Sequence, residues 1–124
     1  MSAIEVMLEK ARRHLDRVSP ADLATFVAEG ALLVDIRPSE NRSREGEMPG
    51  AVVIERNVLE WRLDATGPDA IDAADPGRHV IIVCNEGYAS SLAAHVLRQL
   101  GIVNATDLEG GYRAWRELFP PENG

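Results

Sequence analysis

His79–Ser91 reads HVIIVCNEGYASS, and this stretch decides the fold. Its first part, Val80 to Val83, is continuously apolar and β-branched, which is typical of a central parallel strand covered on both faces. A short polar loop follows, and then a helical pattern runs from Ser90 to Leu100 and ends at Gly101, a typical residue just past a helix C-terminus. A strand, a short loop and a helix in this order predict one unit of a parallel α/β domain.

Other apolar runs of strand length alternate with helical patterns along the chain. We predict strands at 31–34, 51–54, 79–83 and 104–108, and helices at 20–29, 57–63, 90–100 and 111–118. Ser19 and Pro20 are predicted as the N-cap and first residue of the helix that begins there. An amphipathic helix is predicted within residues 1–16, before a domain at residues 17–124. The class is therefore α/β, with a mostly parallel sheet and helices on both faces.

Bulk properties exclude several classes of function. The 124 residues and the net charge of −7 indicate one domain that does not take nucleic acid as its main partner. The single cysteine rules out an internal disulfide, and three histidines on separate predicted elements indicate no metal site. The apolar runs are too short to span a membrane, and the first residues lack a signal-sequence pattern, so we expect a cytoplasmic protein. No cofactor is indicated.

Cys84 stands where a parallel α/β sheet binds ligands, beyond the carboxyl end of a buried strand. A lone cysteine is often a small buried hydrophobe, but a position at the strand exit favours a reactive thiol. The first turn of the following helix leaves backbone N–H donors free, and a loop that curls around the sulfur stabilises a thiolate. Gly87 permits a positive φ, and Ser90 can cap the helix or donate to an anion in the loop. The expected donors are the N–H groups of Asn85, Glu86, Gly87, Tyr88, Ala89 and Ser90.

Four segments resemble the signature motifs of the rhodanese-like family. They are Leu33–Arg37, Glu45–Ala51, Cys84–Ser90 and Leu108–Trp115. The resemblance implies a three-layer α/β/α domain with a five-stranded parallel sheet, to which the N-terminal helix is added. It also implies a sulfurtransferase in which Cys84 takes sulfane sulfur as a persulfide and passes it on. The implied partners are a small-molecule or protein-bound sulfur donor and a thiol acceptor.

The cysteine loop departs from the family in its charge. Many active rhodaneses carry arginine or lysine in this loop, whereas Glu86 is its one charged residue here. A carboxylate repels anionic donors, so we expect thiosulfate to be a poor donor beside a low-charge or protein-bound persulfide. Arg56 or Arg62 could supply a cation at the pocket mouth and Trp61 an apolar wall, unless this segment is a solvated turn with Trp61 in the core. Tyr88 either gates the pocket or covers the helix start.

Two further groups of charged residues are expected to be structural. Asp35 and Arg37 are predicted mainly as a pair that fixes the end of a strand, with Asp35 a minor candidate for the site. Arg12, Arg13 and Arg17 are predicted as a solvated helix face.

The residues of the Cys84 loop also distinguish the competing functions. Phosphatases and arsenate reductases of the related loop type need a longer loop that ends in arginine, but Ser90 and Ser91 occupy those positions. A non-catalytic binding or redox-sensing module stays open because of Glu86, although Cys84, Gly87 and Ser90 together argue against it. The N-terminal helix either pairs two copies in a homodimer or packs onto its own domain.

Overall fold

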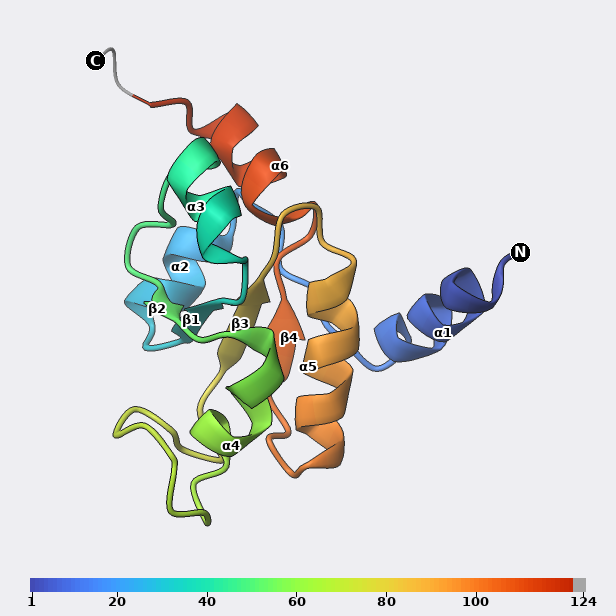
Figure 1. The fold of residues 1–124 in the computed structure, drawn as a ribbon, viewed down its shortest axis with the longest axis vertical. Helices are drawn as coiled ribbons and strands as arrows, with labels where there is room; N and C mark the ends of the chain where they lie inside the picture. Colours follow the sequence, from blue (N-terminus) through green and yellow to red (C-terminus); the bar gives the residue numbers. More distant parts are fainter. Residues whose placement is uncertain (122–124) are drawn as a thin grey trace.

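A computed structural model describes residues 1–121 of the chain. Its four strands form one parallel sheet in the order β2-β1-β3-β4, so β1 and β3 lie at the centre (Figure 1). The strands are β1 (Leu32–Asp35), β2 (Val52–Val53), β3 (Val80–Val83) and β4 (Ala105–Asp107). The predicted α/β class with a parallel sheet is confirmed.

The family resemblance implied a fifth strand, and beside β4 the sheet gains only one bridged residue. Val18 forms an isolated parallel bridge beside β4, in which its N–H donates to the Asp107 carbonyl and its own carbonyl accepts from Glu109 N–H. The next donor in this ladder would come from Pro20, which has no N–H. Pairing therefore stops after a single bridge, and the sheet has four strands among residues 1–121 instead of five.

Helices cover both faces of the sheet. They are α1 (Ala3–Arg12), α2 (Leu23–Ala28), α3 (Ser39–Glu45), α4 (Leu59–Leu63), α5 (Ala89–Gln99) and α6 (Gly111–Leu118), with a 3-10 turn η1 (Arg56–Val58) before α4. One apolar core lies between the sheet and α4 and α5, and a second includes Leu23 of α2 and Tyr112 of α6. None of the helices in residues 1–121 is long and apolar enough to cross a membrane.

The helix after Ser19 begins later than predicted. The Ser19 hydroxyl accepts a hydrogen bond from Asp22 N–H at 3.2 Å, which closes a turn, and α2 starts only at Leu23. Because Val18 is still paired with β4, the chain needs this turn to leave the sheet edge before a helix can begin. Ser19 and Pro20 are therefore turn residues, and their prediction as N-cap and first helical residue is wrong.

The N-terminal helix α1 packs onto its own domain through its C-terminal end. Ala11 and, just after the helix, Leu15 are buried, whereas Ile4 and Met7 are exposed. Figure 1 shows the N-terminal part of α1 extending away from α5. The His14 ring stacks on that of His95 in α5, with 6.3 Å between centroids. The division into residues 1–16 and 17–124 stays a prediction, and its last residues, 122–124, lie outside the described residues.

The start of α6 is built against the backbone of the cysteine loop. Tyr112 and Arg113 donate their N–H groups to the carbonyls of Cys84 and Asn85, at 2.8 and 3.1 Å. Gly111 makes this approach possible, since it has φ +63° and a Cβ placed there would lie 2.5 Å from the Cys84 carbonyl oxygen. A side chain at position 111 would therefore separate α6 from the loop.

Replacing Gly111 by alanine is expected to lower the free energy of unfolding by about 3 kcal/mol, because the backbone strain adds to a clash with main-chain atoms. Gly101→Ala is the matched control, because Gly101 also has a positive φ but a Cβ at this position would have no heavy atom within 4 Å. We expect this control to cost about 1 kcal/mol. Urea unfolding of both variants measures the difference, and equal losses would show that close packing at Gly111 is unimportant.

Candidate active site

Cys84 lies at the carboxyl end of β3, where its side chain is almost fully buried. The sulfur accepts hydrogen bonds from Gly87 N–H at 3.2 Å and Ser90 N–H at 3.4 Å. The structure thus brings two of the six expected N–H donors to the sulfur. Gly87 has φ +86°, the positive value that its place in the loop requires. This loop therefore offers the sulfur a partially positive surface, which favours an anion there.

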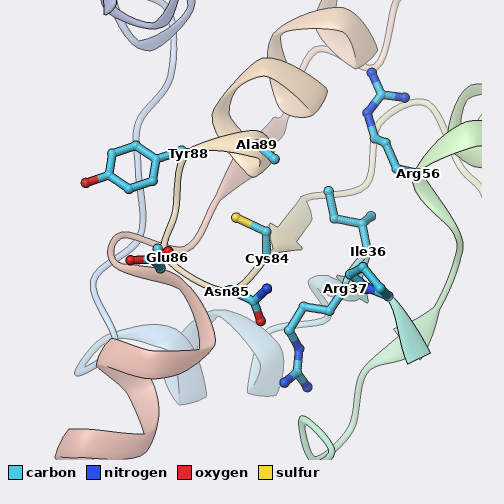
Figure 2. A pocket seen from close by; sticks show the side chains of 9 residues that line it. Ile36, Arg37, Arg56, Cys84, Asn85, Glu86, Tyr88 and Ala89 are labelled. Carbon is cyan, nitrogen blue, oxygen red and sulfur yellow. The ribbon is translucent and has the colours of Figure 1, made fainter. Parts of the chain in front are cut away.

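A cavity of about 370 Å³ opens in front of this sulfur. Figure 2 shows Cys84 at its centre, with Ile36 facing it from the end of β1 and Ala89 from the start of α5. The lining residues are Ile36, Arg37, Pro38, Arg56, Cys84, Asn85, Glu86, Tyr88 and Ala89. Within residues 1–121, no group of three or more His, Cys, Asp or Glu side chains is arranged to hold a metal ion.

Of the two arginines proposed to supply a cation, only Arg56 lines the cavity. It also forms an ion pair with Glu60 at 2.8 Å. Arg62 instead donates to the Asp69 carbonyl at 2.7 Å, because its side chain faces the following loop, so its prediction as a site residue is not supported. Trp61 is 61% exposed and does not line the cavity, so it is neither the predicted wall nor a core residue.

Asp35 and Arg37 form a fully buried ion pair at 2.8 Å. The Arg37 guanidinium also donates to the Gly46 carbonyl and lies 3.8 Å from the centre of the Tyr112 ring. The pair therefore ties the end of β1 to α6 and to the loop after α3. Asp35 is not among the residues that line the cavity, so its minor prediction as a site residue is not supported.

Glu86 and Tyr88 both point outward from the loop. The Glu86 carboxylate lies 3.3 Å from Arg113 of α6, so part of its charge is neutralised there. Arg113 also donates to Glu45, and this hydrogen bond lowers the pKa of the Glu45 carboxyl. Figure 2 shows the Tyr88 ring turned away from Cys84, and it is 58% exposed. Tyr88 therefore contributes to the rim of the cavity, while its ring lies on the outer side of the loop.

Behind the sulfur lies a buried carboxylate that was not among the predicted site residues. Asp107 Oδ2 accepts hydrogen bonds from the hydroxyls of Ser90 and Ser91, at 2.7 and 2.8 Å. The Cys84 thiol in turn donates to Ser90 Oγ at 3.2 Å. Ser90 is thus not the helix cap, since Tyr88 occupies the N-cap position of α5. The available signal was an aspartate near the end of the predicted strand 104–108.

Two arginines from the N-terminal segment hold the loop from its outer side. Arg12 and Arg17 both donate to the Gly87 carbonyl oxygen, at 2.7 and 2.9 Å. Arg17 also forms an ion pair with Asp107 at 2.9 Å, and Arg12 donates to Ser91 Oγ at 3.0 Å. The predicted solvated face is therefore wrong for Arg12 and Arg17. It holds for Arg13, whose side chain is 63% exposed beside Glu9.

Comparison with known proteins identifies the family of this chain. The family model described as "Rhodanese-like domain" matches residues 19–118, and the chain belongs to this family. The resemblance inferred from the four motifs is thereby confirmed. Thiosulfate sulfurtransferase GlpE of Pseudomonas entomophila is 31% identical over 106 residues, which are 86% of this chain and 89% of the relative.

Solved structures agree with the fold. The human single-domain sulfurtransferase TSTD1 is 29% identical and superposes with a TM-score of 0.69 over 82% of this chain and 95% of its own. A Rhodopseudomonas palustris protein, described as of unknown function and a possible tyrosine phosphatase, is 28% identical with a TM-score of 0.86. That similarity covers 98% of this chain and 94% of the other, so it includes most of α1.

Asp107→Ala is expected to lower the free energy of unfolding by about 3 kcal/mol or more, because Arg17 and two serine hydroxyls lose their buried partner. Glu47→Ala is a suitable control, since Glu47 pairs with Arg42 at 3.3 Å but is 66% exposed. Its cost is expected to stay below about 1 kcal/mol. Chemical denaturation compares the two, and a loss at Asp107 as small as the control's would contradict the importance of the buried carboxylate.

Proposed function

We propose that this protein is a sulfurtransferase that moves sulfane sulfur from a donor to a thiol acceptor through a persulfide on Cys84. The observation that carries the proposal is the Cys84 sulfur itself, held between two backbone N–H donors at the floor of a cavity. Membership of the rhodanese-like family and relatives named thiosulfate sulfurtransferase support it. A persulfide is an anion one atom longer than a thiolate, and the same loop suits both.

The reaction takes two displacements at sulfur. In the first, the Cys84 thiolate attacks the terminal sulfur of a donor R–S–SH, the donor's S–S bond breaks, and R–S⁻ leaves with the electron pair. The proton of the transferred sulfur passes to solvent, which leaves Cys84–S–S⁻ in the cavity. In the second, an acceptor thiolate attacks that outer sulfur, the new S–S bond breaks, and Cys84 departs as a thiolate. Stabilising this thiolate assists both the attack and the departure.

Charge around the cavity favours a donor of low charge. Arg37 is bound by Asp35, and Arg56 is paired with Glu60, so neither lining guanidinium is without a carboxylate partner. Glu86 adds a further carboxylate at the mouth, although Arg113 neutralises part of its charge. Thiosulfate would bring two negative charges into this environment, whereas an alkyl or protein-bound persulfide brings one or none. We therefore assign a low-charge or protein-bound persulfide as the preferred donor.

Cys84→Ser tests the nucleophile. Because the substituted hydroxyl cannot form a persulfide, transfer from any donor to a thiol acceptor should fall by at least about a thousandfold, while the variant stays folded. Sulfide release is measured with thiosulfate and with 2-hydroxyethyl persulfide as donors. A folded wild-type protein that turns over neither donor would instead favour the binding or redox-sensing module.

Glu86→Lys tests the donor preference. Reversal of this charge should raise kcat/KM for thiosulfate by about tenfold, because the loop then attracts the dianion. For 2-hydroxyethyl persulfide, whose hydroxyethyl group carries no charge, kcat/KM should change by less than about threefold. Glu86→Gln separates the lost carboxylate from the added cation and should give an intermediate result for thiosulfate. The same change for both donors would argue against charge as the basis of selection.

Phosphate ester hydrolysis is not the proposed activity, although one structural neighbour is described as a possible tyrosine phosphatase. The positions that such a loop needs for arginine hold Ser90 and Ser91, whose hydroxyls both donate to buried Asp107. Without that arginine, the loop lacks the guanidinium that would bind a phosphate dianion.

A further inference from the structure

The N-terminal segment reaches the loop that holds the cysteine sulfur. The family match begins at residue 19, so Arg12 and Arg17 both lie before it. Their guanidinium groups nevertheless meet on one atom, the carbonyl oxygen of Gly87, at 2.7 and 2.9 Å. The N–H of Gly87 donates to the Cys84 sulfur. One residue therefore connects the two arginines to the reacting atom.

These contacts fix the orientation of the loop backbone. With its carbonyl held on the outer side by two charged donors, Gly87 cannot turn that oxygen toward the sulfur. Charge-assisted hydrogen bonds of this kind are stronger than neutral ones. Gly87 is also confined by the start of α6, because a Cβ at this position would lie 2.8 Å from the Gly110 nitrogen. The loop is thus clamped between the start of α6 and the N-terminal segment.

The two arginines differ in their charge balance. Arg17 is neutralised by its ion pair with Asp107. Arg12 donates to Ser91 Oγ and the Gly87 carbonyl and lies 5.6 Å from the Tyr88 ring centre, all of which are uncharged partners. Within residues 1–121, no carboxylate lies at ion-pair distance from Arg12. Its positive charge is therefore available to the loop, which has no cation of its own.

We propose that Arg12, the last residue of α1, and Arg17, in the segment that follows, are positioning residues of the Cys84 loop. The N-terminal segment is thereby required for the reactivity of Cys84. Arg17, with Asp107, sets the geometry. Arg12 adds the positive charge that the loop sequence lacks, and this charge favours the anionic forms of Cys84, namely the thiolate and the persulfide. The persulfide part of this assignment rests on the proposed function, whereas the thiolate part does not.

The test measures the rate at which Cys84 in the full chain reacts with iodoacetamide, a neutral reagent, as a function of pH. Arg12→Gln removes the charge, Arg12→Lys keeps it, and Arg13→Gln is the control on the same helix end. For Arg12→Gln, the half-maximal rate should move to higher pH, and the rate at neutral pH should fall about three- to tenfold. Arg12→Lys should stay close to wild type, and Arg13→Gln should remain within about twofold. Thermal unfolding of each variant establishes that it is folded.

A folded Arg12→Gln variant with a wild-type pH profile would overturn the assignment, and so would an Arg12→Lys variant that behaves like Arg12→Gln. Arg17→Gln leaves Asp107 buried without its ion-pair partner, so it should lower thermal stability as well as reactivity. Arg17→Gln with unchanged stability and unchanged alkylation would remove Arg17 from the proposal. Alkylation needs no sulfur donor, so this test stays valid even if the protein transfers no sulfur. Failure of the proposed sulfur transfer would show separately, in a turnover assay.

Discussion

The arrangement of the active site depends on one buried carboxylate, that of Asp107 at the end of β4. A buried charge is costly unless it is paired and hydrogen-bonded, so each of its partners has to be in place in the folded state. Those partners come from different parts of the chain, since Ser90 and Ser91 begin α5 and Arg17 precedes the sheet. Satisfying this one group therefore fixes the first turn of α5 against β4, and with it the loop that carries Cys84.

A second constraint is the absence of side chains where backbones meet. Gly111 approaches the carbonyl of Cys84, and Gly87 approaches the nitrogen of Gly110, so neither contact leaves room for a Cβ. The N–H groups at the start of α6 then bond to the carbonyls of the cysteine loop. Because α6 binds these carbonyls on the side away from the cavity, the N–H groups of Gly87 and Ser90 can face the sulfur. The cavity side is the one left open to a substrate.

Much of this fold could be predicted from local sequence patterns. The uninterrupted β-branched run at 80–83 indicated the central strand, and its exit indicated where Cys84 would stand. The missing fifth strand depends on a single missing donor at Pro20, which a family resemblance does not reveal. The sequence also does not show which way a surface side chain points. Arg56 lines the cavity, whereas Arg62 turns to the Asp69 carbonyl, and nothing in the sequence distinguishes the two.

The supporting residues were the hardest to predict, because their contacts span the chain. Arg12 and Arg17 are 75 and 70 residues from Gly87, and an arginine-rich helix end is usually solvated. They reach the outer side of the loop only in the folded chain, where α1 lies beside α5 and Val18 pairs with the edge of β4. Asp107 was more accessible to prediction, since an aspartate at the end of a buried strand needs a partner.

Whether Cys84 carries sulfane sulfur is shown most directly by the intact mass of the protein after incubation with 2-hydroxyethyl persulfide. We expect a gain of one sulfur atom in the wild type, reversed by a thiol and absent in Cys84→Ser. A folded protein whose Cys84 reacts with iodoacetamide but never gains sulfur from this donor or from thiosulfate would contradict the proposed persulfide.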